Sequence, residues 1–184
     1  GPTILGAAGF HFPTRMVVVR MANGSVWLWS PVAFTADLAK AVAALGPVSA
    51  LVAPNALHHM ALTDWAQAFP DAQIYGAPGV AAKRPELTLH ALDSTAVWPE
   101  DFAQVLYPNT ITDEFWFLHH ASGTLMVTDL VQQMPLNWFR GWRAVVARAD
   151  KMTGHRPEVP RKFRLATRDK RAARMAVRHM LDGG

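Results

Sequence analysis

Short apolar runs and stretches of helical spacing alternate along the first half of the chain. Residues 48–53 form an apolar run of the length expected for a buried strand. Residues 15–20 are rich in Val, residues 26–29 carry two Trp, and Asn23-Gly24 lies between these segments. Because Asn and Gly tolerate positive φ, this dipeptide predicts a hairpin. Both alternating faces of residues 26–29 are apolar, which predicts a sheet that is covered on both sides.

Two helices are predicted among these strands. Thr35 is a suitable N-cap for a helix that reaches about residue 45, where Gly46-Pro47 ends it. Residues 59–69 repeat their apolar side chains at helical spacing, so we expect a second helix there. Each helix directly follows or precedes a predicted strand, an arrangement that is typical of layered α/β structure.

The middle of the chain predicts further strands, separated by turn residues. These strands cover residues 73–77, 87–92, 104–107, 115–119 and 124–130. Ala121-Ser122-Gly123 makes the short turn between the last two of them. Strands that first alternate with helices and then follow one another indicate an α/β or α+β layered domain.

The C-terminal region, residues 136–184, is predicted to be helical and basic. Trp138 and Trp142 are four positions apart, so we expect both on one helix face, in the core or at a contact within a homo-oligomer. Thr167 is a candidate N-cap for a last helix that reaches about residue 181. At 184 residues the chain fits a single domain, residues 1–184, with a sizeable core.

Charge is distributed unevenly along the chain. The net charge is +4, yet residues 140–184 hold 13 basic and 4 acidic residues, whereas residues 1–139 hold 5 and 10. The two parts should attract each other, and a basic region can also bind phosphates or nucleic acid. We favour a solvated helix face docked on an acidic body over a nucleic-acid partner, because no nucleic-acid-binding motif is present.

Composition excludes several classes of protein and several kinds of metal site. No apolar run reaches the roughly 20 residues that span a bilayer, and the first residues lack the features of a signal peptide. We therefore expect no membrane association and a cytoplasmic location. The absence of Cys excludes disulfides and thiolate metal ligands, so any metal must be held by His, carboxylate or carbonyl groups.

The residues best suited to chemistry stand near strand ends. His58 and His59 follow the run 48–53, and His119 and Asp129 belong to two later predicted strands. Imidazole and carboxylate bind Zn, Mn or Fe, and an open coordination position activates a water molecule. We therefore expect these four side chains to hold one divalent metal at one edge of the sheets, with His58 and Asp129 as the catalytic residues.

Other arrangements of the same residues stay open. A metal-free polar network, in which Asp129 accepts a hydrogen bond from His119 or His59, is also compatible with the sequence. Ser122, His59 and Asp129 form a conceivable nucleophile set, although the Gly-x-Ser-x-Gly elbow that usually carries such a serine is missing. In the simpler interpretation the Ser122 hydroxyl satisfies backbone groups of its turn.

Three residues are candidates for binding a small-molecule substrate. Lys83 and Arg84 follow a Pro-Gly turn and could bind an anionic group, although a surface pair or a helix end explains them as well. Asn55 lies three residues before His58 and could position or polarise the substrate.

Three groups of residues carry a resemblance to a known family. They are Ala53-Pro54-Asn55-x-x-His58-His59, then Gly76-Ala77-Pro78-Gly79 with Lys83-Arg84-Pro85, then His119-x-x-Ser122-x-Thr124-Leu125 with Thr128-Asp129-Leu130. In combination they resemble a bacterial domain-of-unknown-function family that is grouped with the metallo-β-lactamase-fold hydrolases. The resemblance runs from about residue 10 to about residue 181 and implies a four-layer αββα sandwich with a metal-type site at one edge of its two sheets.

The resemblance also implies where this chain departs from the superfamily. Aligning the metal signature His-x-His-x-Asp-His on His59 places Pro54 and Ala56 at the first two His positions, so those ligands are lost. His119 and Asp129 resemble the second His and the bridging Asp, and a final His strand is absent, as if a C-terminal portion were missing.

This pattern is compatible with two functions. The first is a divergent metal-dependent hydrolase, in which metal-activated water attacks an ester, lactone, amide or phosphoester. The alternative is a non-enzymatic module of the same fold, without bound metal, that binds a small molecule at the degenerate site or an anion or nucleic acid through its basic last helix.

Overall fold

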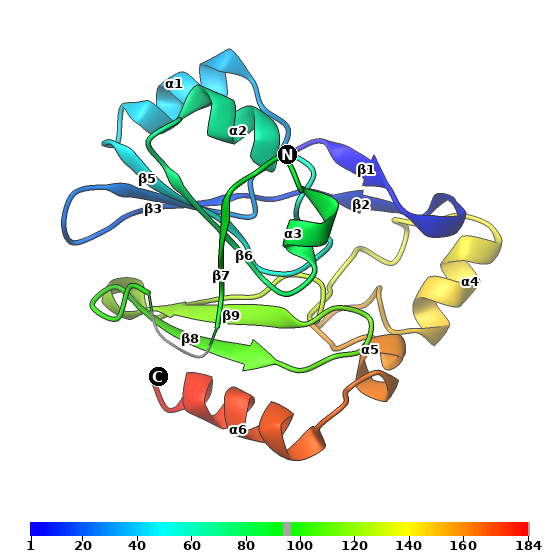
Figure 1. The fold of residues 1–184 in the computed structure, drawn as a ribbon. Coiled ribbons are helices and arrows are strands. Elements are labelled where there is room, and N and C mark those ends of the chain that lie inside the picture. Colours follow the sequence, from blue (N-terminus) through cyan, green and yellow to red (C-terminus); the bar gives the residue numbers. More distant parts are fainter. Residues whose placement is uncertain (94–96, 184) are drawn as a thin grey trace.

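The computed structural model describes residues 1–93 and 97–183, and in this part the chain forms three β-sheets and six α-helices (Figure 1). The strands are β1 (Thr3–Leu5), β2 (His11–Pro13), β3 (Val17–Arg20), β4 (Val26–Trp29), β5 (Val48–Ala53), β6 (Gln73–Gly76), β7 (Leu89–Ala91), β8 (Phe102–Tyr107), β9 (Glu114–His119) and β10 (Thr124–Met126). The helices are α1 (Ala36–Ala43), α2 (Leu62–Ala68), α3 (Val80–Lys83), α4 (Trp142–Ala149), α5 (Arg161–Leu165) and α6 (Lys170–Leu181).

The largest sheet has five strands in the order β3-β4-β5-β6-β7. Strand β3 pairs with β4 in the antiparallel direction, and β4 to β7 are parallel. The predicted hairpin is confirmed, because Gly24 has φ +84° in the loop between the paired residues Arg20 and Val26. Parallel strands need covered faces on both sides, and all four residues of β4 are buried, as the alternation predicted.

Helices α1 and α2 pack on one face of this sheet. The Thr35 hydroxyl accepts a hydrogen bond from the Leu38 N–H at 3.2 Å, which confirms Thr35 as the N-cap of α1. Trp65 of α2 is fully buried, and its indole N–H donates to the carbonyl of Val32 at 2.7 Å. A buried Trp with its N–H satisfied anchors α2 against the sheet.

The other face of the five-stranded sheet packs against a second sheet, in the order β10-β9-β8. Trp27 of β4 stacks on Phe102 of β8, with ring centroids 4.4 Å apart, and meets Phe117 of β9 edge-on at 5.2 Å. Alternate residues of β9 point the opposite way, so Trp116 belongs to a separate apolar cluster with Met180 of α6. Strand β9 is therefore buried on both faces.

The layers follow one another in the order helices, five-stranded sheet, three-stranded sheet, helix α6 (Figure 1). The β1–β2 hairpin lies beside this stack and packs on the segment that precedes α4, through Phe10 and Phe139 with ring centroids 5.1 Å apart. Within the described residues, no helix is both long enough and apolar enough to span a bilayer.

The C-terminal region differs from the prediction at its first helix. Helix α4 begins at Trp142 rather than near residue 136, so Trp138 lies in a loop and not one helical turn from Trp142. Trp142 is 54% exposed, and the prediction that it packs in the core of this chain is therefore wrong. The reason is that Trp138 and Phe139 pack on the β1–β2 hairpin, which draws this segment out of helical geometry.

The last two helices also differ in detail from the prediction. Residues 161–165 form the short helix α5, which the sequence pattern did not single out. Helix α6 is capped by Asp169, whose carboxylate accepts from the N–H groups of Arg171 and Ala172 at 2.8 and 2.9 Å. Thr167, the predicted cap, instead donates its hydroxyl to the carbonyl of Phe163 at 3.0 Å.

Candidate active site at the edge of the two sheets

Four segments bring polar side chains together at one edge of the two packed sheets. Ser30 follows β4, Asn55 and His58 follow β5, Glu114 begins β9, and Asp129 follows β10. Strands β4 and β5 are parallel, so their carboxyl ends meet at the same edge, where open α/β sheets place ligand-binding residues. Strand β10 was predicted to reach residue 130 but ends at Met126, which frees the next segment to turn toward β5.

His58 lies between a hydroxyl and a carboxylate. Its Nδ1 is 2.5 Å from the Ser30 Oγ, and its Nε2 is 3.1 Å from the Asp129 Oδ2. The side chains of His58 and Asp129 are 26% and 25% exposed, so solvent reaches this pair. Ser30, His58 and Asp129 therefore form a continuous chain of hydrogen bonds that opens to solvent at one end.

The ionised Asp129 determines where the protons lie in the hydrogen bonds from Ser30 through His58 to Asp129. A carboxylate can only accept, so in neutral His58 the proton resides on Nε2. The lone pair then lies on Nδ1, and the Ser30 hydroxyl donates to it. This is the proton arrangement that a serine nucleophile activated by histidine requires.

Ser30 has an unusual backbone for a residue with a side chain. Its φ is +54°, in the left-handed region that costs a non-glycine residue about 1–2 kcal/mol. Its N–H donates to the carbonyl of Val52 at 2.8 Å, which ties the strained residue to β5. Only 4% of Ser30 is exposed, and strained buried residues at strand ends are typical of functional sites.

Glu114 lies beneath this chain of hydrogen bonds and is completely buried. Its Oε1 accepts from the Trp116 indole N–H at 3.0 Å and from the Thr128 N–H at 2.9 Å. Its Oε2 accepts from the Asn55 amide at 3.0 Å and from the Asp129 N–H at 2.9 Å. All of these partners are donors, so the carboxylate fixes the segment that carries Asp129.

Asn55 joins Glu114 to Asp129 and is also completely buried. Its amide nitrogen lies 3.0 Å from Glu114 Oε2, 2.8 Å from Asp129 Oδ2 and 2.8 Å from the Thr128 hydroxyl. Its carbonyl oxygen accepts from the Leu57 N–H at 2.8 Å, forming a local turn. With its amide group engaged in this way, Asn55 positions Asp129.

The pKa values of Glu114 and Asp129 are shifted in opposite directions. Burial raises the pKa of Glu114, and the neighbouring charge of Asp129 raises it further. Burial also tends to raise the pKa of Asp129, but the hydrogen bond and charge of His58 and the bond from Asn55 outweigh it and lower that pKa. The lowered pKa keeps Asp129 ionised at neutral pH, so that its carboxylate orients His58.

The predicted metal ligands do not all meet. His58 and Asp129 are in contact, but His119 ends β9 whereas Glu114, which contacts Asp129, begins it. The length of this six-residue strand separates them by roughly 16 Å. Within residues 1–93 and 97–183, no three His, Asp or Glu side chains are grouped as metal ligands. The expectation that all four residues converge is therefore wrong.

His59 lies on the other side of the β5–α2 connection, close to a basic pair. The Arg84 guanidinium donates to the His59 carbonyl at 3.0 Å, and Lys83 donates to the Ala56 carbonyl at 2.7 Å. Burial lowers the pKa of His59, and the charges of Arg84 and Lys83 lower it further. In the structure, these two basic residues hold the backbone that carries the site.

Ser122 does not take part in the cluster. It contacts the His119 Nδ1 at 2.8 Å and donates to the Thr124 hydroxyl at 2.8 Å, beyond the far end of β9. The set Ser122, His59 and Asp129 is therefore not assembled.

Sequence reasoning missed Ser30 and Glu114, because neither stands in a recognisable motif. Ser30 is 28 positions from His58, and Glu114 is 59 positions from Asn55. Only the left-handed backbone of Ser30 and the complete burial of Glu114 distinguish them, and both properties belong to the folded chain.

A comparison with known families shows a similarity over the first half of the chain. Residues 4–92 match a family described as Domain of unknown function (DUF4336). The matched part is just under half of the chain and includes Ser30, Asn55 and His58, but neither Glu114 nor Asp129. The match provides no link to the metallo-β-lactamase superfamily. No curated protein matches the chain.

Proposed function

We propose that this protein is a hydrolase of small acyl compounds, an ester, lactone or amide, with Ser30 as its nucleophile. The observation that carries the proposal is the continuous contact from Ser30 through His58 to Asp129, at 2.5 and 3.1 Å. The lowered pKa of Asp129 supports it, because an ionised Asp129 sets the tautomer of His58 that accepts the serine proton.

The reaction divides into two steps at these residues. In the first, Ser30 Oγ attacks the carbonyl carbon while its proton passes to His58 Nδ1. The bond to the leaving group breaks, and that group takes the proton from His58. In the second, water attacks the acyl–Ser30 ester, His58 accepts a proton from the water, and this proton restores the Ser30 hydroxyl. Asp129 stabilises the charge on His58 in both steps.

A metal-dependent mechanism fits the same residues less well. Both ring nitrogens of His58 already have partners, and the Asn55 amide occupies the space between the carboxylates. Zinc needs free imidazole or carboxylate lone pairs in a tetrahedral arrangement. The donor set around Asp129 therefore favours hydrogen bonding over metal binding.

The architecture itself is a second part of this proposal. We infer a metallo-β-lactamase-like αββα sandwich, since the layers follow the order of helices, two sheets and helix. In that superfamily the site lies at one edge of the two sheets, which is where Ser30, His58 and Asp129 meet. The proposal is that this chain keeps the scaffold and has replaced metal chemistry with a serine.

A specific observation favours a second candidate, a non-enzymatic binding module. The Ser30 N–H is taken by the Val52 carbonyl, and Pro31 has no N–H. Neither Ser30 nor Pro31 thus offers a backbone donor for the oxyanion of a tetrahedral intermediate, and such a donor usually contributes about a hundredfold or more to the rate. In this alternative the same edge would bind a small molecule without converting it.

Labelling with a fluorophosphonate and turnover of short p-nitrophenyl esters and lactones test the proposal. We expect one labelled serine, identified as Ser30 by peptide mass spectrometry, and loss of both signals in Ser30→Ala. Ser122→Ala is the matched control, because Ser122 also contacts a histidine but that histidine has no carboxylate partner in the described structure. The control should keep full labelling and turnover.

The outcomes separate the mechanisms. Turnover that survives Ser30→Ala but disappears with chelator, and returns with Zn, Mn or Fe, would replace the serine mechanism with the metal-dependent one. A folded protein that neither labels nor turns over any substrate would support the binding module. Circular dichroism of each variant shows whether it is folded, so a loss of activity can be assigned to chemistry.

A further inference from the structure

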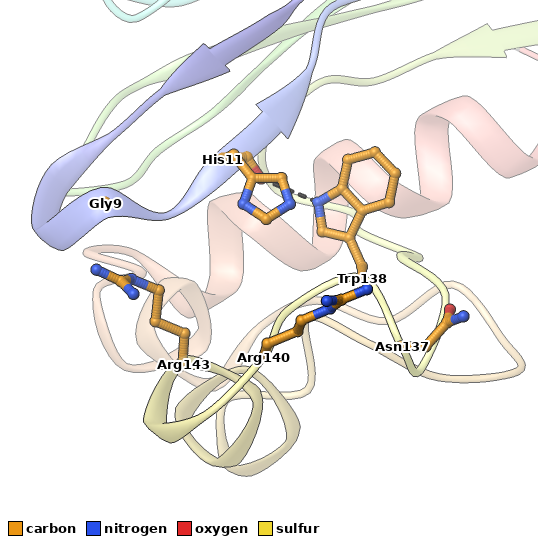
Figure 2. Close-up of a pocket in the computed structure, with 6 residues that line it drawn as sticks. All are labelled: Gly9, His11, Asn137, Trp138, Arg140 and Arg143. Atoms are coloured by element: carbon orange, nitrogen blue, oxygen red, sulfur yellow. Dashed lines mark hydrogen bonds between the residues drawn. The ribbon is translucent and has the colours of Figure 1, made fainter.

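A hollow of about 500 Å³ lies between the turn of the β1–β2 hairpin and the loop that leads into α4 (Figure 2). Its lining residues are Gly9, His11, Asn137, Trp138, Arg140 and Arg143. This volume is within the range of pockets that hold small organic molecules. The hollow and the Ser30 site share no residue, so a ligand of the hollow is independent of the proposed hydrolase activity.

The lining is cationic, and its charge is not neutralised. No acidic residue lines the hollow, and neither Arg140 nor Arg143 forms an ion pair with any residue that the structure describes. Arg140 also makes no hydrogen bond within the described part of the chain. Two guanidinium groups without carboxylate partners at one hollow provide strong, geometrically specific donors for an anion.

Arg143 is held in place by the hairpin turn. Its Nε donates to the Ala8 carbonyl at 2.8 Å, which leaves the two terminal nitrogens for a ligand. Gly9 has φ +71°, and a Cβ added there would lie 2.6 Å from a terminal nitrogen of Arg143. Only glycine therefore allows both this turn and the close approach of the guanidinium.

A rigid aromatic wall lies beside the two arginines. The Trp138 indole N–H donates to the His11 carbonyl at 3.0 Å, and the rings of these two residues lie with centroids 5.2 Å apart (Figure 2). Because this hydrogen bond fixes the indole, the wall is preorganised for a flat ligand. The combination of a planar apolar surface and two guanidinium groups in one lining matches an aromatic anion.

We propose that this hollow is a binding site for a small organic anion whose phosphate or carboxylate group binds Arg140 and Arg143 and whose flat ring packs on Trp138. Both anionic groups have the oxygen geometry that guanidinium recognises, and the experiment distinguishes them. The site would select its ligand by charge and by ring, and inorganic phosphate, which lacks the ring, binds more weakly.

Isothermal titration with phenyl phosphate, benzoate, inorganic phosphate and phenol tests this site on the full chain. Phenyl phosphate or benzoate should bind, the tighter of the two identifying the anionic group, and phenol should not. Arg140→Gln and Arg143→Gln should each weaken binding by about tenfold or more, as expected for a charge-assisted hydrogen bond. Arg174→Gln on α6 is the matched control, since Arg174 is also exposed and unpaired among the described residues.

Gly9→Ala separates geometry from charge. It leaves the net charge unchanged but forces Arg143 to move, so binding should weaken although both arginines remain. Equal weakening by Arg174→Gln and by Arg140→Gln would mean general charge attraction and would overturn the proposal. Failure of both phenyl phosphate and benzoate to bind at millimolar concentration to the folded protein would overturn it as well.

Discussion

The polar cluster around Glu114 and the hollow beside Arg140 both contain charged groups, but these groups differ in burial and in hydrogen bonding. Glu114 is completely buried, and each of its oxygens accepts at least two hydrogen bonds. Arg140 is exposed and has no polar partner in the part of the chain that the structure describes. Burial makes an unsatisfied charge costly, so the first cluster must be saturated, whereas water can solvate the second.

This difference indicates what each region can do. The cluster at the sheet edge is rigid and positions His58 and Asp129, which suits chemistry that needs fixed geometry. The hollow exposes unused hydrogen-bond donors, which suits the capture of a ligand that brings its own charge. Substitutions in the two regions should therefore differ sharply in their effect on stability, and substitutions at four positions measure that contrast.

The largest effect is expected from Glu114→Ala. Removal of the carboxylate leaves the Trp116 indole N–H and the backbone N–H groups of Thr128 and Asp129 without an acceptor. We expect the free energy of unfolding to fall by about 3–5 kcal/mol in urea denaturation at neutral pH, because each donor left unpaired costs about 1 kcal/mol or more. Glu86→Ala, at an exposed carboxylate, is the control and should leave the unfolding midpoint close to that of the wild type. A loss below about 1 kcal/mol for Glu114→Ala would show that the network contributes little.

Asp129→Asn should show a dependence on pH. The pKa of Asp129 is lowered in the folded protein from its ordinary value of 3.8, so its contribution to stability is present above that pH and is lost as pH falls below it. At neutral pH we expect the variant to be less stable by about 1–2 kcal/mol. The difference from the wild type should shrink when unfolding is measured at successively lower pH, from neutral to below 3.8. A constant difference would contradict the lowered pKa.

Ser30→Gly and Ser30→Ala together measure the strain at the nucleophile. Both remove the hydroxyl, but only Ala keeps the cost of a side chain at φ +54°. We expect the Gly variant to be the more stable by about 1 kcal/mol. At Ser49, in β5 with its ordinary strand backbone, the same pair should give the opposite order, because Gly weakens a strand. The same order at both positions would argue against strain at Ser30.

The smallest effect is expected from Arg140→Gln. The side chain is exposed and unpaired in the described structure, so the free energy of unfolding should change by less than about 0.5 kcal/mol. Thermal and urea denaturation of the variant beside the wild type would measure it. A larger loss would mean that Arg140 supports the fold, and the contrast with Glu114 would then weaken.

Several elements could be predicted because their signals are local. The Asn23-Gly24 hairpin, the Thr35 cap and the strand over residues 48–53 are all present. Each depends on backbone preference or side-chain spacing within a few residues. The prediction of one helix through Trp138 and Trp142 was wrong. Their spacing is helical, but packing on the β1–β2 hairpin outweighs this local pattern.

The candidate site was predicted only in part. His58 and Asp129 were predicted as site residues because their side chains can act in catalysis. They are in contact, although 71 positions separate them. The sequence also favoured His119, which lies at the wrong end of β9. Position within a strand decides which edge a residue reaches, and strand boundaries are the least certain part of a sequence-based prediction.

By itself, the sequence determined the order of strands β3 to β10 and of helices α1 and α2, the apolar content of the sheets and the basic character of the last 45 residues. Only the tertiary structure decided that Ser30, rather than Ser122, contacts a histidine linked to Asp129, and that Glu114 lies beneath them. The physical reason is that hydrogen bonds between distant segments depend on how the apolar faces of the two sheets pack, and no local preference encodes that contact.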